Sequence, residues 1–188
     1  MLRRIVTITA LAIGGAVLAK QMKKSGSRGK SSSVRESIDV DVPLRTAYDQ
    51  FTQFEQFPQF MKSVHEVQQL DDKRLHWRAD VMGTPIEWDA EITEQIPDKR
   101  IAWRSTSGTP NDGVVSFQRM SDQRTKVTLE MRYEPQDALE SIGDMLGAVR
   151  IETRSNLERF KEMIEQRGTE TGAWRGTINA QSEITKPH

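Results

Sequence analysis

The sequence contains no cysteine and only three histidines among its 188 residues. A chain without cysteine forms no disulfide bonds, thiolate metal sites or cysteine nucleophiles. The histidines, His65, His76 and His188, have none of the spacings found in histidine metal sites, and no glycine-rich signature of a phosphate- or dinucleotide-binding loop is present. We therefore expect no metal and no cofactor.

Acidic residues are absent from the first 35 positions, which carry eight lysines and arginines. Residues 36–188 hold 19 basic and 27 acidic residues. The formal charge of the whole chain is zero, but this part alone carries a net charge of minus eight. Nucleic-acid-binding domains usually have the opposite sign. The charge pattern predicts no nucleic-acid partner, and it leaves protein partners open.

The longest uncharged run, IVTITALAIGGAVLA (residues 5–19), lies between Arg3-Arg4 and three lysines at positions 20, 23 and 24. We predict that residues 1–24 form a hydrophobic membrane segment with basic flanks. The run is shorter than the roughly 20 residues of a typical spanning helix, but flanking lysines can reach the interface of a thin bilayer. Basic residues directly after the run favour an uncleaved anchor in a bacterial inner membrane. Cleavage of a secretory signal near Ala19, followed by export, is the alternative.

Three further regions follow from composition and periodicity. Residues 25–33 (SGSRGKSSS) are rich in glycine and serine, carry basic charge and predict a flexible linker. Residues 34–167 hold the alternating and helical patterns of one folded domain. Residues 168–188 are polar and without periodicity, which predicts a disordered tail.

Within 34–167 the patterns predict an α+β fold. Period-two alternation around Val40 is followed by two short helical stretches, the second interrupted by Pro58, and then by further alternating segments up to residue 133. A helix is predicted over residues 137–167, with Gly168 as its stop. This order indicates a curved antiparallel sheet of about seven strands wrapped around a long C-terminal helix.

Aromatic and sulfur-containing side chains gather on the predicted inner face of this sheet. Three tryptophans on three strands suit an apolar pocket, and the predicted helix carries Gly143 and Gly147, each of which costs about 1 kcal/mol relative to alanine. For any single residue an ordinary core position is the competing interpretation. The predicted ligand-binding residues are Trp77, Trp88, Trp103, Phe117, Met131, Tyr133, Met145 and Val149.

The sequence predicts no catalytic set. Glu87, Asp89 and Glu91 alternate with apolar residues, so we expect them to face solvent. Arginines at 78, 104 and 132 occupy equivalent polar positions and could pair with such acids across the sheet.

Several strings resemble the polyketide cyclase/dehydrase family of the START-like (SRPBCC) superfamily, which includes coenzyme-Q-binding proteins. They are FEQFPQFMKSVHEV (54–67), IEWDAEI (86–92), RIAWRSTSG (100–108), GVVSFQ (113–118), VTLEMRYEP (127–135) and LERFKEMIE (157–165). The resemblance covers about residues 33–167 and implies a helix-grip fold with a deep apolar cavity between sheet and helix. It also implies ligands such as lipids, quinones, polyketides or steroids, which some relatives convert and many only carry.

Three functions follow as hypotheses. The first is a membrane-tethered carrier that binds a lipid or isoprenoid quinone without chemistry. The second is a cyclase- or dehydratase-type enzyme that uses Tyr133, Ser105 or Arg104 on a polyketide-like or aromatic substrate. The third is a membrane-associated scaffold that binds partners through its acidic outer face and the tail around Trp174.

If residues 5–19 form an uncleaved anchor, the mature protein keeps Met1 or Leu2 at its N-terminus and resists extraction with alkaline carbonate. N-terminal sequencing of the membrane fraction and of the soluble fraction checks this. A soluble form that begins at Lys20 would replace the anchor with the exported alternative.

Overall fold

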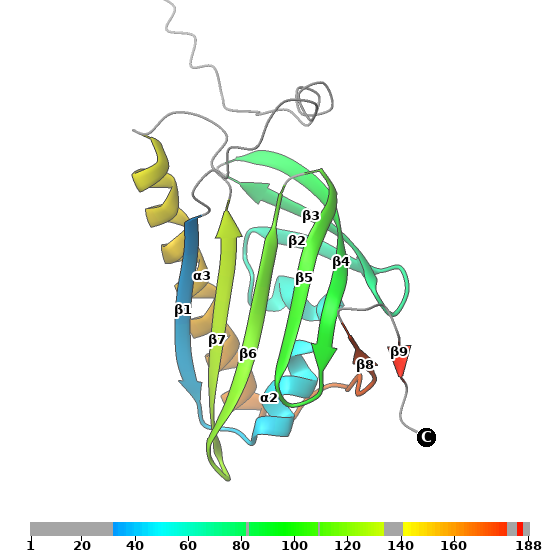
Figure 1. Ribbon diagram of the computed structural model, residues 1–188. Helices are drawn as coiled ribbons and strands as arrows, with labels where there is room; N and C mark the ends of the chain where they lie inside the picture. Colours follow the sequence, from blue (N-terminus) through cyan, green and yellow to red (C-terminus); the bar gives the residue numbers. More distant parts are fainter. Residues whose placement is uncertain (1–31, 82, 109, 134–140, 180–183, 186–188) are drawn as a thin grey trace, which may run out of the picture.

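The computed structural model describes residues 32–81, 83–108, 110–133, 141–179 and 184–185 (Figure 1). The predicted membrane segment and residues 25–31 of the predicted linker lie outside these ranges. Ser32 and Ser33, assigned above to the linker, belong to the first strand. No helix within the described ranges is long and apolar enough to cross a membrane.

The elements follow the predicted order. The first strand and the two short helices are β1 (Ser32–Val40), α2 (Leu44–Phe51) and the 3₁₀ helix η1 (Phe54–Gln59). Six strands follow: β2 (Val64–Gln69), β3 (Arg74–Val81), β4 (Thr84–Ile96), β5 (Arg100–Gly108), β6 (Asp112–Ser121) and β7 (Arg124–Tyr133). The chain continues through α3 (Ser141–Arg167), β8 (Thr177–Ile178) and β9 (Ile184–Thr185).

Seven strands form one curved antiparallel sheet in the order β1-β7-β6-β5-β4-β3-β2. The helices lie against one face, with α2 near the lower end of the sheet in Figure 1 and α3 running along β1. The predicted sheet and its C-terminal helix are therefore confirmed. Pro43 stands directly before α2, where its missing N–H costs no hydrogen bond.

The long helix is buried in only one half. Leu157, Phe160 and Ile164 are fully covered, whereas Ile151, in the N-terminal half of α3, is 68% exposed. The start of α3 extends past the upper end of β1 (Figure 1). Gly168 ends the helix as predicted: its φ is +72°, and its amide donates to the carbonyl oxygen of Ile164 at 2.8 Å. The predicted helix start at residue 137 lies outside the described ranges.

A set of aromatic rings fills the space between α2, η1, α3 and the sheet. Phe51 occupies the centre, with its ring centroid 4.7 Å from Phe160, 5.4 Å from Phe57 and 5.6 Å from Phe117. These three contacts are edge-to-face, the arrangement that aromatic quadrupoles favour. The lower half of the interior is therefore closely packed core.

The predicted disorder of the tail is wrong for residues 168–179, which we call the C-terminal strap. The strap leaves α3, crosses the lower end of the domain past α2 and reaches β4, where Ile178 pairs with Gln95 (Figure 1). Ile178 is 1% exposed, and the Arg175 guanidinium bonds to both Asp49 and Asp98 at 2.7 Å. The strap has the polar composition of a disordered segment because most of its partners are polar groups distant in sequence.

Replacing Ile178 by alanine tests the position of the strap. Truncation of a buried isoleucine costs about 2–5 kcal/mol. We expect the lower part of this range, because a two-residue strand can detach without unfolding the domain. The free energy of unfolding in urea measures the effect. Ile151→Ala is the matched control and should change stability by less than about 0.5 kcal/mol, since the side chain is exposed. Equal stability of both variants would contradict the docked strap.

Candidate functional site

Two tryptophans stack on the inner face of the sheet, in its upper half. Trp77 on β3 and Trp88 on β4 are direct partners in the strand register, and their rings lie 5.4 Å apart at an angle of 11°. Both are at least nine-tenths buried. The Nε1–H group of Trp77 is buried and has no hydrogen-bond acceptor within the described part of the chain. A buried donor without an acceptor is unfavourable by about 1–3 kcal/mol, so an oxygen atom of a ligand at this point would be stabilising.

The third tryptophan extends this aromatic wall across the sheet. Trp103 on β5 lies opposite Gly113 on β6, and Gly113 in turn pairs with Met131 on β7. A Cβ atom at Gly113 would come within 2.5 Å of the Trp103 ring, so glycine provides the room in which the indole lies. The Trp103 indole donates to Asn111 at 3.3 Å. The indole N–H of Trp103 therefore has an acceptor, whereas that of Trp77 has none within the described residues.

The structure separates the other predicted ligand-binding residues from this wall or leaves them unplaced. Phe117 lies lower on β6 and packs edge-to-face with Tyr48 and Phe51, as part of the core. Val149 is half-buried on the upper half of α3. The side chains of Tyr133 and Met145 lie outside the described residues. Trp77 and Trp88 thus pair directly, and Trp103 and Met131 lie on either side of Gly113. Ile92, which pairs with Trp103, lies on the same face of β4 as Trp88 and connects these two parts of the surface.

Gly147 does not bring α3 close to the sheet. A Cβ atom built at this position has no atom of the described residues within 4 Å. Close packing of helix against sheet is therefore not what offsets the cost of this glycine. Space for a ligand remains the prediction for Gly147, and Gly143 has no described side-chain environment.

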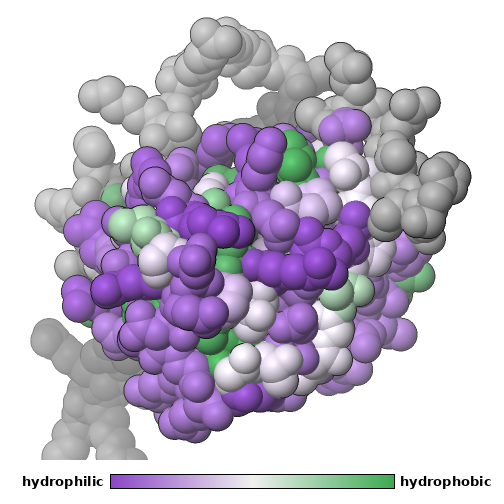
Figure 2. Space-filling model, turned by 90° about the horizontal axis from the view of Figure 1, so that it is seen from below, coloured by the Kyte–Doolittle hydropathy of each residue, from purple (hydrophilic) through white to green (hydrophobic). Residues whose placement is uncertain are grey.

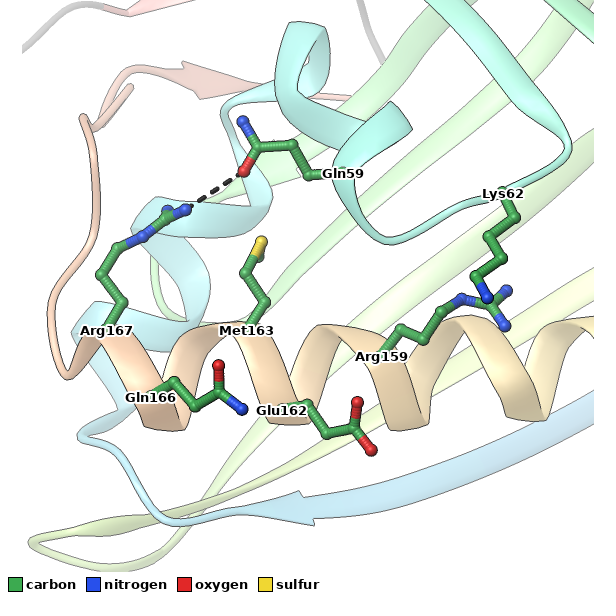
Figure 3. A pocket seen from close by; sticks show the side chains of 7 residues that line it. All are labelled: Gln59, Lys62, Arg159, Glu162, Met163, Gln166 and Arg167. Atoms are coloured by element: carbon green, nitrogen blue, oxygen red, sulfur yellow. Dashed lines mark hydrogen bonds between the residues drawn. The ribbon is translucent and has the colours of Figure 1, made fainter.

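Two surface cavities lined by described side chains lie along α3. The larger, of about 600 Å³, is an open groove between η1 and the C-terminal half of the helix (Figure 3). Figure 3 shows Met163 in the middle of this groove, with polar side chains at both ends. The Arg167–Gln59 hydrogen bond of 3.1 Å lies at one end, and Arg159 and Lys62 lie at the other. The smaller cavity, of about 180 Å³, lies between β1 and α3. Neither is lined by the tryptophans.

The carboxylates of β4 lie on the outer face, as predicted. Asp89 accepts from Ser107 at 2.7 Å and lies 2.8 Å from Nδ1 of His76, and these hydrogen bonds hold the pKa of Asp89 below its usual value. Arg78 bridges two strands by pairing with Glu66 at 3.0 Å and Glu87 at 3.2 Å. Across the described ranges, no three histidine or acidic side chains converge as metal ligands.

Of the three polar residues considered for an enzyme, Arg104 lies away from the aromatic wall, Ser105 lies beside it, and the side chain of Tyr133 is outside the described residues. Arg104 is exposed and pairs in register with Glu91 on the outer face. Ser105 pairs with the buried Ala90 and so shares the inner face with Trp103, and its hydroxyl donates to the carbonyl oxygen of Ser107 at 3.1 Å.

The sequence analysis did not predict a cluster of buried polar side chains at the lower end of the domain. Asp49, Gln50 and Gln95 are each 1% exposed, and the Tyr48 hydroxyl and the Gln95 amide nitrogen have no hydrogen-bond partner in the described ranges. Burial raises the pKa of Tyr48 to about 12 and also raises the pKa of Asp49. Tyr48 shows only helical periodicity with apolar neighbours, and this pattern contains no signal of its polar surroundings.

Residues 40–162 match the model of the family described as polyketide cyclase / dehydrase and lipid transport. The chain belongs to this family. It is 52% identical over 148 residues to an uncharacterized 17.2 kDa protein of Streptomyces lincolnensis, covering 78% of this chain and 99% of that protein. The match confirms the resemblance found in the sequence, and the coenzyme-Q-binding relatives remain a prediction.

Solved structures share the fold. The Zhui aromatase/cyclase of Streptomyces sp. R1128 has a TM-score of 0.64 at 16% identity, covering 77% of this chain and 99% of that chain. A START superfamily protein from Mycobacterium smegmatis has a TM-score of 0.58 at 17% identity, covering 72% and 95%. A Deinococcus radiodurans protein has a TM-score of 0.58 at 28% identity, covering 72% and 99%. The helix-grip, START-like fold is thereby confirmed, and family membership supports either hydrophobic-ligand binding or a cyclase role.

Proposed function

We propose that this protein binds a hydrophobic small molecule against the aromatic wall formed by Trp77, Trp88, Trp103 and Met131, without converting it. The observation that carries the proposal is the buried Trp77 indole, stacked on Trp88 and left without an acceptor. Flat apolar rings stack favourably on indole, and the free N–H selects a ligand with an oxygen acceptor beside its ring. An isoprenoid quinone has both features, as does a lipid with a carbonyl group near an apolar chain.

Binding without chemistry is favoured over a cyclase role by the polar groups near this wall. Arg104 is on the outer face, and the Ser105 hydroxyl is bonded to backbone. General acid–base catalysis needs a titratable group within hydrogen-bond reach of the substrate. The described wall residues carry indole and thioether groups, and the Ser105 hydroxyl beside them is bonded to backbone and does not titrate near neutral pH.

The proposal includes a tether. The basic, apolar N-terminus fits an anchor in the bacterial inner membrane, and a domain attached there has direct access to lipids and quinones. The glycine- and serine-rich composition of residues 25–31 is typical of a linker, which fits a tethered domain.

Menadione, a small naphthoquinone, serves as the test ligand because it quenches tryptophan fluorescence when bound nearby. Trp77→Phe keeps an aromatic ring but removes the N–H donor. Since a hydrogen bond contributes about 0.5–1.5 kcal/mol net, the variant should raise the Kd for menadione roughly two- to tenfold. Fluorescence titration of the full-length chain measures this.

Trp174→Phe is the matched control, because that indole lies on the strap and donates to Asp72 at 3.2 Å, away from the wall. It should leave the Kd unchanged. Circular dichroism of both variants verifies the fold. The proposal fails if the wild type binds no menadione, or if Trp77→Phe and Trp174→Phe bind it equally well.

A further inference from the structure

The C-terminal strap closes the lower end of the sheet through a small number of polar contacts. Arg175 joins two elements across this end: its guanidinium bonds to Asp49 on α2 and, with two nitrogens at 3.1 and 2.7 Å, to Asp98 in the β4–β5 turn. The Trp174 amide donates to the Thr52 hydroxyl at 3.0 Å. Figure 2 shows that this lower face is mostly hydrophilic, so the apolar interior is covered here.

The residues beneath the strap are unusually polar for the end of a core. Asp49, Gln50, Thr52 and Gln95 are at most 2% exposed. Two atoms of this region, the Tyr48 hydroxyl and the Gln95 amide nitrogen, have no partner in the described ranges. Buried polar atoms without partners are destabilising, and water would satisfy them if the strap moved away. This composition suits a surface that is exposed to solvent part of the time.

A line of aromatic rings connects the strap to the aromatic wall. Arg175 lies over the Tyr48 ring at 5.7 Å, and the Tyr48 ring lies 5.5 Å from Phe117. Phe117 and Phe57 both contact Phe51, and Phe57 lies 5.7 Å from Trp77. The line therefore runs from the strap to the site of the proposed function without a polar layer between them.

The strap is held by partly exposed polar contacts, by the ion pair of Arg175 with the buried Asp49 and by the buried side chain of Ile178. Arg175 is about one-quarter exposed and Asp98 about one-third, so solvent and salt screen part of their attraction. The strap shares only one register pair with β4, between Gln95 and Ile178. Gly168, with a positive φ, provides a sharp turn between α3 and the strap.

We propose that the strap is a reversible plug: when Arg175 leaves Asp49 and Asp98, the strap and α2 move away together. The Tyr48 and Phe51 rings on α2 then leave the packed lower core, and the inner site exchanges its ligand through that end. The opening is a property of the fold, whereas the ligand exchange rests on the proposed function. The two parts are therefore measured separately.

The first experiment measures opening by hydrogen exchange on the full-length chain. Arg175→Gln removes the charge that holds the strap, and Arg154→Gln is the control because it breaks an exposed helical pair with Glu158. We expect amide exchange in α2 and the strap to rise at least tenfold in Arg175→Gln, with β6 and β7 unchanged. A uniform rise across the domain, or no rise at all, overturns the plug.

The second experiment measures entry. In a Trp174→Phe background, where the strap indole is gone, acrylamide quenching of the remaining tryptophans should increase at least twofold on adding Arg175→Gln. Stopped-flow mixing with menadione should show association and dissociation rates that each rise at least threefold, with less than a twofold change in Kd. Faster amide exchange with unchanged quenching overturns the entrance. Faster quenching without menadione binding supports the opening and overturns the proposed function alone.

Discussion

The fold depends on covering one face of a curved seven-stranded sheet with aromatic rings. Phe51 and the rings around it occupy the lower half of that face and hold α2, η1 and the buried half of α3 in place. Each edge-to-face pair adds about 0.5–1.5 kcal/mol beyond the area it buries. The packing continues through Phe57 to Trp77, so the tryptophan surface is supported by the same core.

The interior combines this close packing with polar atoms that it does not satisfy. The indole of Trp77 faces the upper half, and the Tyr48 hydroxyl and the Gln95 amide lie beneath the strap. A domain selected for stability alone would place apolar atoms at these points. One of these groups lies at the proposed ligand surface, and two lie at the proposed lower entrance.

Much of the architecture could be predicted from local patterns, because alternation, Pro43 and Gly168 act over a few residues. Alternation also placed Trp77 and Trp88 on the inner face of neighbouring strands, whereas their direct pairing depends on a register that alternation does not give. The strap could not be predicted in this way, since Arg175 meets Asp49 and Asp98 only after the chain has folded. Alternation predicts that Phe117 points inward, which is correct, but it does not predict which inward residues contact the core. Phe117 lies at the part of β6 that faces α2, and its ring packs on Tyr48.

The central claim is that the tryptophan surface holds a hydrophobic ligand. Native mass spectrometry of the full-length chain, extracted from membranes under mild conditions, tests it most directly. The account predicts a stoichiometric adduct of small-molecule mass that is depleted in Trp77→Phe and retained in Trp174→Phe. The same adduct in both variants, or a chain that carries none and takes up no quinone or lipid on addition, would contradict it.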